Sequence, residues 1–347
     1  MLLEQLSNAI GVSGEEDAVR KIILDAIKDH VTDIRIDAMG NLTALKKGNG
    51  KSKLKVLIAA HMDEIGMMIT GHDSSGMLRF TNIGGVPARI LPGLRVKVGS
   101  DAMQGVVLWH PIHKNQSQTV KSLKDLRIDI GTTSKGAAEG KAKLGTRATF
   151  DSTYAEMGDM LRGKAFDDRV GCSLLIDILQ ADAYDVDVYA AFTVQEEIGL
   201  RGAQVVARRI QPDAAIILEG TTAHDIPDLD NNPDDTLSNN PACKVGSGPA
   251  ITVMDSGMIT APQMLKFVRQ TAKDNNIPHQ IKTARGGRTD GAHIHNSNTG
   301  IPTTVINVPC RYIHSPTAFL SKTDYTHTLQ LTQAVLNTIS PDAIIFE

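Results

Sequence analysis

Nearly continuous apolar runs, separated by helical patterns, dominate both ends of the chain. Runs that are apolar at most positions, instead of at every second one, predict strands buried on both faces of a sheet. These runs cover residues 56–60, 186–194, 214–218 and 303–308. Apolar positions at helical spacing cover 171–179, 201–210 and 261–275. The alternation predicts an α/β domain with a mainly parallel sheet and helices on both faces.

The first 45 residues predict one helix and two strands. Ser13 to Glu16 has the Ser-x-x-Glu spacing of a capping box, in which hydroxyl and carboxylate each satisfy a free backbone amide. The apolar residues from Val19 to Ile27 then lie on one helical face. Two strand-like runs follow, at 34–37 and 42–45.

The pattern changes between residues 71 and 162. This region is rich in glycine, and short β-like runs with turn signals between them replace the long helices. The runs lie at 77–80, 94–98, 105–109, 127–130 and 147–150, with one short helix near 134–139. Closely spaced short strands predict a small β-barrel or sandwich. We therefore predict an α/β domain, 1–70 and 163–347, into which a β domain, 71–162, is inserted.

Composition narrows the classes of function. The chain has 347 residues, a net charge of −3 and a pI near 6.4, so nothing indicates binding to nucleic acid or to a membrane surface. We find no signal peptide and no membrane-spanning run. The three cysteines form no Cys-x-x-Cys pair. Sparse, unpaired cysteines fit a reducing compartment, and we expect a cytoplasmic protein.

Metal-binding side chains follow each of the predicted strands. The carboxyl ends of parallel strands form one edge of a sheet, where ligands bind. Each residue alone has an ordinary explanation, as a surface histidine, a solvated helix N-terminus or an exposed loop pair. Their convergence indicates a dinuclear metal hydrolase, in which one carboxylate bridges two ions and another takes a proton from water. The candidates are His61, Asp63, Asp167, Asp168, Glu196, Glu197, Glu219 and His314.

Glu196 and Glu197 are the most informative pair. Adjacent carboxylates at the end of a buried strand repel each other and lose hydration, a cost that a cation offsets. Neighbouring residues point in different directions, so one can bind metal while the other remains free as a base. Asp63 follows His61 by two residues and can orient its imidazole.

Five segments resemble the glutamyl aminopeptidase family, which includes the tetrahedral aminopeptidases and some members labelled endoglucanase. In family order they are AAHMDEIGMM, GKAFDDRVGCSLL, FTVQEEIGLRGA, GGRTDGAHIH with GIPT, and RYIHS, and they span nearly the whole chain. The resemblance implies a metalloaminopeptidase that removes N-terminal residues from peptides. It also implies a PDZ-like β insert between the His-x-Asp and Asp-Asp-Arg motifs, through which dimers form and assemble into a dodecamer.

The resemblance further implies a role for each candidate. Two Zn²⁺ or Co²⁺ ions would be bound in each subunit. Glu196 would be the general base, and Asp63 would be the carboxylate behind the histidine ligand. The implied ligands are His61 and Glu219 for one ion, Glu197 and His314 for the other, and Asp167 as the bridge.

The chain departs from the family pattern in two regions, at Glu219 and at Arg288 with His293. Many relatives carry Asp where Glu219 stands, and Asp225, six residues on, is the fallback ligand. Relatives often read Gly-Gly-Thr-Asp where this chain has Arg288 before Thr-Asp, and His293 replaces a small residue. A cation at these positions is expected to influence which N-terminal residue is accepted, and a structural arginine is an equal alternative.

Other motifs and functions are less favoured. The histidine pair at 110 and 113 lies in the insert without a nearby acid, and the acidic stretch 228–235 lacks the glycine and glutamate of an EF-hand loop. A dinuclear carboxypeptidase or deacylase is the alternative enzyme, although those place their extra domain after the Glu-Glu motif. A glycosidase needs no histidine-bearing metal cluster. A non-catalytic homologue is expected to lose Glu196 or a ligand, and all are present.

Overall fold

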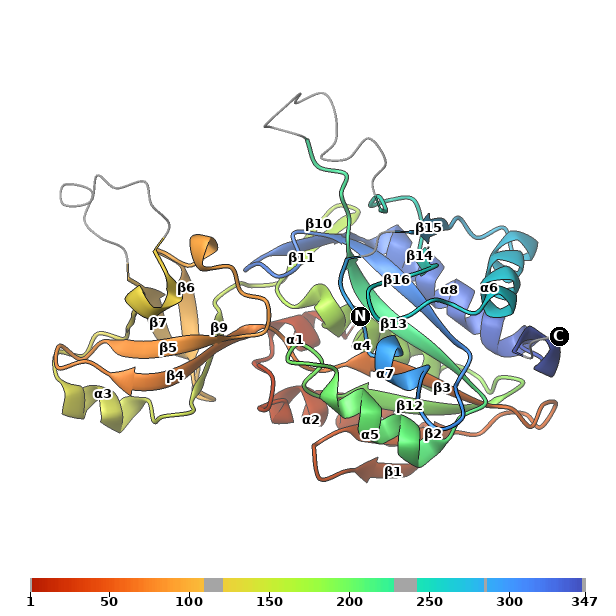
Figure 1. Cartoon of the computed structure of the whole chain (residues 1–347), viewed down its shortest axis with the longest axis horizontal. Helices are drawn as coiled ribbons and strands as arrows, with labels where there is room; N and C mark the ends of the chain where they lie inside the picture. The colour runs from red at the N-terminus through yellow and green to blue at the C-terminus, as the bar shows by residue number, and fades with distance from the viewer. Residues whose placement is uncertain (1, 109–120, 228–241, 284–285, 345–347) are drawn as a thin grey trace.

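The structure is a computed structural model that describes residues 2–108, 121–227, 242–283 and 286–344 (Figure 1). A large sheet covered by helices forms one body, and a smaller β-barrel lies at one end of it (Figure 1). The predicted motifs at 110–113 and 228–235 lie outside the described residues. Among the helices described, none is long and apolar enough to cross a membrane.

Among the described residues the large sheet has eleven strands, and it is parallel mainly at its centre. Along the sheet the order is β1-β2-β12-β3-β13-β16-β17-β11-β10, and β14 and β15 pair beside β16. The four neighbours β12, β3, β13 and β16 run parallel. The strands that flank them pair antiparallel, and β15 pairs parallel to β14. The bounds are β1 Thr32–Ile36, β2 Leu42–Lys46, β3 Lys55–His61, β10 Ala155–Met157, β11 Met160–Gly163, β12 Asp187–Thr193, β13 Ala214–Thr222, β14 Ala250–Thr252, β15 Gln280–Lys282, β16 Thr303–Arg311 and β17 Ala318–Ser321.

The prediction of a mainly parallel sheet was wrong, because the sheet is mixed. Its parallel centre consists of the long apolar runs that the sequence showed clearly. The antiparallel strands at its edges are mostly three to five residues long. Strands this short leave little periodicity to recognise.

Helices cover both faces of the parallel centre. Alternate residues of β3 enter different cores: Val56, Ile58 and Ala60 pack on one face, and Leu57 and Ala59 on the other. Both faces are therefore buried, which explains why the central strands read as continuous apolar runs. The helix bounds are α1 Leu3–Asn8, α2 Asp17–Ile27, α3 Lys135–Lys141, α4 Phe166–Gln180, α5 Arg201–Ile210, α6 Pro262–Asp274, α7 Gly291–Ile294 and α8 Lys322–Thr338, with 3₁₀ turns η1 Ala88–Ile90, η2 Leu123–Asp125 and η3 Pro341–Ala343.

The inserted strands close into a six-stranded barrel with its own apolar core (Figure 1). The strand order around it is β4-β5-β8-β7-β6-β9. Its strands run from residue 66 to residue 150, and β10 and β11 that follow join the large sheet. The domain boundaries at 70/71 and 162/163 stay a prediction, and the strand pairing differs from them at both ends. The bounds are β4 Gly66–His72, β5 Leu78–Ile83, β6 Arg95–Val98, β7 Met103–Val107, β8 Ile128–Asp129 and β9 Arg147–Phe150.

The predicted capping box does not form. Helix α2 begins after Glu16, and no side chain caps it. The Ser13 hydroxyl donates instead to the Asp63 carboxylate, 2.6 Å away, and Glu16 accepts from the amide of Gly14. Ser13 therefore makes a tertiary contact instead of a helix cap. It contacts the edge of the sheet where the candidate site lies.

Candidate metal centre and substrate cavity

The predicted ligands converge at the carboxyl ends of the parallel strands. His61 ends β3, Glu219 lies within β13, and His314 follows β16. Glu196 and Glu197 lie in the loop after β12, and Asp167 stands in the first turn of α4. Because all these strands run parallel in the centre of the sheet, residues more than 250 positions apart meet at one edge.

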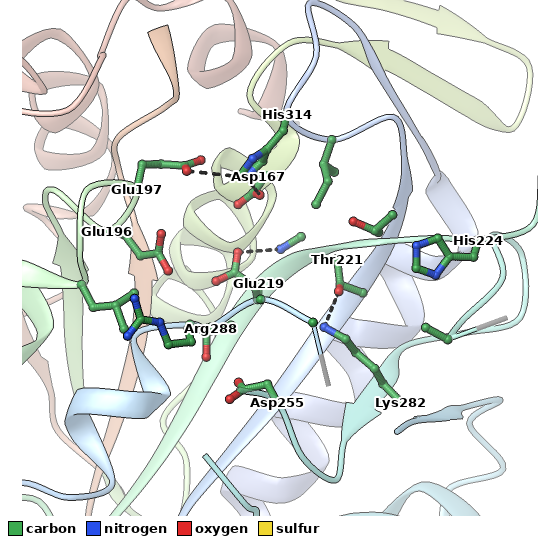
Figure 2. A pocket seen from close by; sticks show the side chains of 18 of the residues that line it. Asp167, Glu196, Glu197, Glu219, Thr221, His224, Asp255, Lys282, Arg288 and His314 are labelled. Atoms are coloured by element: carbon green, nitrogen blue, oxygen red, sulfur yellow. Dashed lines mark hydrogen bonds and ion pairs between the residues drawn. The ribbon is translucent and has the colours of Figure 1, made fainter. Parts of the chain in front are cut away.

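Asp167 lies between the two histidines. Its Oδ1 is 3.1 Å from His61 Nε2, and its Oδ2 is 3.3 Å from His314 Nε2. Glu219 Oε1 lies 3.6 Å from His61 Nε2, and Glu197 Oε2 lies 3.5 Å from His314 Nε2. Each histidine therefore shares Asp167 and has one glutamate of its own. Figure 2 shows His314 beside Asp167 and Glu197.

Asp63 holds the Glu196-Glu197 loop in place. Its two carboxylate oxygens accept the backbone amides of Glu196, at 2.9 Å, and of Glu197, at 3.2 Å. The His61 Nδ1 contacts the backbone carbonyl of Asp63 at 3.1 Å and its carboxylate at 3.4 Å. Asp63 is fully buried and contacts both His61 and the Glu196-Glu197 loop. The His-x-Asp spacing predicted only the contact with the histidine.

Burial and neighbouring negative charge raise the pKa values of the three glutamates. The pKa of Glu197 is raised to about 8 and that of Glu219 to about 7, because burial disfavours the ionised form and Asp167 adds negative charge. Burial also raises the Glu196 pKa well above its usual value. Asp167 behaves oppositely: burial opposes its ionisation, but hydrogen bonds from the two histidines keep its pKa well below the usual range.

Among the described residues, no lysine or arginine compensates this group of acids, and the two histidines are its nearest basic groups. Among the described residues, no Lys or Arg nitrogen lies within 4 Å of a carboxylate oxygen of Asp167, Glu196, Glu197 or Glu219. The neighbouring acid Asp168 is bound by backbone amides instead. Its oxygens accept the backbone amides of His61, at 3.0 Å, and Gly171, at 2.9 Å.

A cavity of about 590 Å³ opens beside the acids. Figure 2 shows His314 and the carboxylates of Asp167, Glu196, Glu197 and Glu219 gathered at one end, and Thr221, Lys282 and His224 toward the other. Arg288 lines this cavity and is exposed, whereas His293 does not line it. Lys282, His224 and Asp255 had no recognisable sequence motif, because each lies outside the strand-end pattern and reaches the cavity only through the fold.

Comparison with known proteins identifies the family of the chain. The family model described as M42 glutamyl aminopeptidase matches residues 40–331. The chain belongs to this family. It is a peptidase hydrolase, and the family membership expected from the five segments is confirmed.

Relatives of this M42 peptidase match over nearly their whole length. A putative aminopeptidase of Acetivibrio thermocellus is 38% identical, with 95% of this chain and 96% of the relative covered. An aminopeptidase structure from the archaeon Desulfurococcus kamchatkensis has a TM-score of 0.92 at 36% identity, covering 99% and 95%. The TET1 peptidase of Pyrococcus horikoshii, described as assembling into a tetrahedron or a large octahedral shell, has a TM-score of 0.84 at 31% identity, covering 97% and 98%.

The fallback ligand of this peptidase is engaged elsewhere. Asp225 accepts two hydrogen bonds from Arg311, both at 2.8 Å, and one from the amide of Val245. Glu219, by contrast, faces His61. The structure therefore brings Glu219 to the candidate centre and keeps Asp225 in a bidentate ion pair.

Proposed function

We propose that this M42 peptidase removes N-terminal residues from peptides with the help of two divalent metal ions. His61 and Glu219 would hold one ion, Glu197 and His314 the other, and Asp167 would bridge them. The observation that carries the proposal is the position of Asp167, which presents one oxygen to each histidine. M42 peptidases are metal-dependent, and His61, Asp167 and Glu197 offer ligand atoms within 4.8 Å of one another.

The separations between donor atoms suit shared ions. Two ligands about 2.0–2.2 Å from a tetrahedral ion lie roughly 3.4 Å apart. The four N–O distances around Asp167, Glu219 and Glu197 range from 3.1 to 3.6 Å. Imidazole nitrogen with carboxylate oxygen is a donor set that suits Zn²⁺ and Co²⁺.

The charge of the site also favours cations. Burial and the charge of Asp167 raise the pKa values of Glu197 and Glu219 despite the neighbouring histidines, which favours protons on these carboxylates when no metal is bound. Binding of metal would displace these protons and remove the repulsion. Asp168 is not proposed as a ligand, because backbone amides already occupy both of its oxygens.

In this proposal the protein's own residues divide the work. The bound ions would supply a nucleophilic water at neutral pH and polarise the scissile carbonyl. Glu196, which is buried and whose side chain makes no hydrogen bond to another described residue, would accept the water's proton and pass it to the leaving amine. Asp63 would keep Glu196 in place through the backbone amide that it binds.

A panel of substrates tests the aminopeptidase reaction directly. The protein, reconstituted with Zn²⁺ or Co²⁺, is expected to release the first residue from free peptides and from aminoacyl chromogenic substrates. It should not cleave the same peptides after N-terminal acetylation. Release of C-terminal residues, or cleavage of acetylated substrates alone, would support a carboxypeptidase or a deacylase instead.

We also propose a homo-oligomer that is built through the barrel and reaches twelve subunits. The similarity to a peptidase described as forming tetrahedral and octahedral shells supports this proposal. The barrel has its own core and extends away from the large sheet, which leaves its surface available for contact between subunits (Figure 1). Light scattering of the metal-loaded protein is expected to show a large complex, and a monomer at micromolar concentration would contradict it.

The cytoplasm is the compartment that we propose. All three cysteines are free and buried. Unpaired cysteines fit a reducing environment. Fractionation of the native host cells would test this location.

A further inference from the structure

The base loop, residues 194–197, carries the two cavity glutamates, and its four backbone amides donate to side chains from the N-terminal part of the chain. The amide of residue 194 donates to Asn41 Oδ1 at 3.0 Å, and that of residue 195 donates to Glu16 Oε1 at 3.3 Å. Asp63 accepts the other two. All three acceptors are buried, so the loop is held from below by side chains that are themselves fixed.

Glu16 is the least expected of these acceptors. Its side chain is 2% exposed, and its Oε1 also accepts the amide of Gly14 at 2.6 Å. Among the residues that the structure describes, no Lys or Arg nitrogen lies within 4 Å of its carboxylate, and burial raises its pKa. A buried acid without a cation lowers stability, and such departures from local rules are typical of functional positions.

Gln195 sets the direction in which the loop continues from β12. Its φ is +56°, in the left-handed region that residues other than glycine rarely adopt. Such a conformation persists only where the surrounding groups fix it. The bond from Glu16 holds the amide of Gln195 itself, and Glu196 is the next residue. A rotation of the backbone here would turn Glu196 away from the cavity that it lines (Figure 2).

The turn that contains Glu16 holds the base loop a second time. Ser13 donates to Asp63 Oδ2 at 2.6 Å, and the same oxygen accepts the amide of Glu197. The turn is fixed from the barrel, because Arg147 Nε on β9 donates to the Ser13 carbonyl at 3.2 Å. Ser13 and Glu16, which do not cap α2, therefore both support the base loop, one through Asp63 and one directly.

We infer that Glu16 is a positioning residue for Glu196: by accepting the amide of Gln195, it fixes the direction in which the proposed base enters the cavity. The inference rests on the proposed function, in which Glu196 transfers the proton. It requires the length of the Glu16 side chain and an acceptor oxygen at its end. It does not require the negative charge.

Two variants of Glu16 separate length from charge. Glu16→Gln keeps the length and an acceptor oxygen, so kcat of the metal-loaded protein is expected to stay within about threefold of wild type. Glu16→Asp keeps the charge but withdraws the oxygen by one methylene from the Gln195 amide. Its kcat is expected to fall about 10- to 100-fold, with KM and metal content unchanged. An active Glu16→Asp with an impaired Glu16→Gln would overturn the positioning role.

A third variant applies if Glu16→Asp does not fold. Glu16→Met fills a similar space without an acceptor oxygen, so the Gln195 amide loses its partner while the site stays filled. The same fall in kcat is expected. Wild-type kcat in folded Glu16→Met would overturn the inference.

A double-mutant cycle shows whether Glu16 acts through Glu196. In Glu196→Gln the proposed base is absent, so adding Glu16→Asp should lower kcat by less than about twofold. Asp324→Ala is the matched control, because Asp324 is also a buried acid that accepts two backbone amides, from Gly246 and Gly248. Its effect on kcat should be the same in both backgrounds. Equal effects of Glu16→Asp in both backgrounds would make Glu16 a structural residue only.

Hydrogen exchange of the metal-free protein gives a readout that does not depend on activity. The amides of the base loop are expected to exchange at least about 10-fold faster in Glu16→Asp than in wild type, while those of β3 keep their rates. Unchanged exchange in the base loop would overturn the inference even if activity fell.

The outcomes separate this inference from the function on which it rests. Release of no N-terminal residue by the wild-type protein contradicts the aminopeptidase proposal, and full activity of Glu196→Gln contradicts its general base. An active wild type that depends on Glu196, together with wild-type kcat in Glu16→Asp, overturns the role of Glu16 alone.

Discussion

The buried carboxylate of Glu64 lies close to the buried acids around Asp167, and the charges that neighbour them differ. Glu64, the residue after Asp63, binds Lys164 through both oxygens and lies 3.4 Å from Arg169 Nη2. The acids around Asp167 have two histidines but no lysine or arginine within 4 Å among the described residues. We interpret the carboxylate that is paired with a lysine or arginine as structural. The carboxylates without such a pair are the better candidates for binding a metal ion.

The pKa values follow the same division. Burial opposes ionisation of Glu64, but Lys164 and Arg169 outweigh it and lower its pKa. Burial of Glu197, with Asp167 beside it, raises the pKa to about 8. Since both carboxylates are almost fully buried, the difference reflects the charges that the fold places next to each. The comparison can be tested by removing one member at a time.

Replacing the proposed bridge should have the largest effect. In Asp167→Asn a neutral amide would stand between the two histidines and could not serve as a charged bridge. Activity is expected to fall by more than about 10³-fold, because two-metal stabilisation is worth several kcal/mol. Elemental analysis should find well under two ions per chain. Two tightly held ions in this variant would remove Asp167 from the role of bridge.

Glu196→Gln should separate proton transfer from metal binding. The variant is expected to keep its ions, because Glu196 is not a proposed ligand, and to lose roughly 10²–10⁴-fold in kcat. Rate measurements at full metal content provide the check. A rate within threefold of the wild type would rule out Glu196 as the base.

Glu64→Gln should affect stability more than chemistry. Lys164 would remain buried beside an uncharged amide, and breaking such a pair costs about 3–5 kcal/mol in the free energy of unfolding. Denaturant unfolding of the chelated protein at pH 7 measures this loss. Asp25→Asn, which breaks the exposed pair with Lys21, is the control and should change stability far less.

The same variant has a pH signature. The Glu64 pKa is lowered on folding, so its contribution is fully present above the unfolded value of about 4.5 and is lost as the pH falls through the folded value. The difference in stability between wild type and Glu64→Gln should therefore shrink below about pH 4.5. A difference that stays constant down to pH 3 would show that the ion pair does not stabilise the fold.

Arg288→Ala should have the smallest effect. Arg288 lines the cavity but is exposed, so water and salt screen its charge. We expect the ratio of kcat/KM for acidic over apolar aminoacyl substrates to change by less than about threefold. A larger change would show that Arg288 influences which N-terminal residue is accepted.

The central strands and most of the candidate centre could be predicted from the sequence. Long apolar runs mark strands that are buried on both faces. Parallel strands have their carboxyl ends at one edge of the sheet, so ligands at the ends of these runs are predicted to meet there. The short antiparallel strands at the sheet edges could not be predicted, because three to five residues show little periodicity. The Ser13–Glu16 spacing predicted a helix cap, but the Ser13 hydroxyl donates to the Asp63 carboxylate instead.

The cavity shows where sequence reasoning ends. Arg288 was found because it interrupts a motif, but Lys282 lies at the end of a three-residue strand without any motif. Lys282 reaches the cavity wall only through the pairing of β15 with β14, which a linear sequence does not show. Asp225 and Glu219 were both acceptable ligands at the sequence level, and only the position of Arg311 separates them.

The contacts of Glu64 have a consequence for exchanging barrels between related enzymes. Besides Lys164 and Arg169, Glu64 accepts a 2.8 Å hydrogen bond from the hydroxyl of Thr149, which belongs to barrel strand β9. A transplanted barrel that lacks this hydroxyl would leave a buried carboxylate one donor short, three residues from His61. The modular unit for a chimaera is therefore the barrel together with Glu64, Lys164 and Arg169.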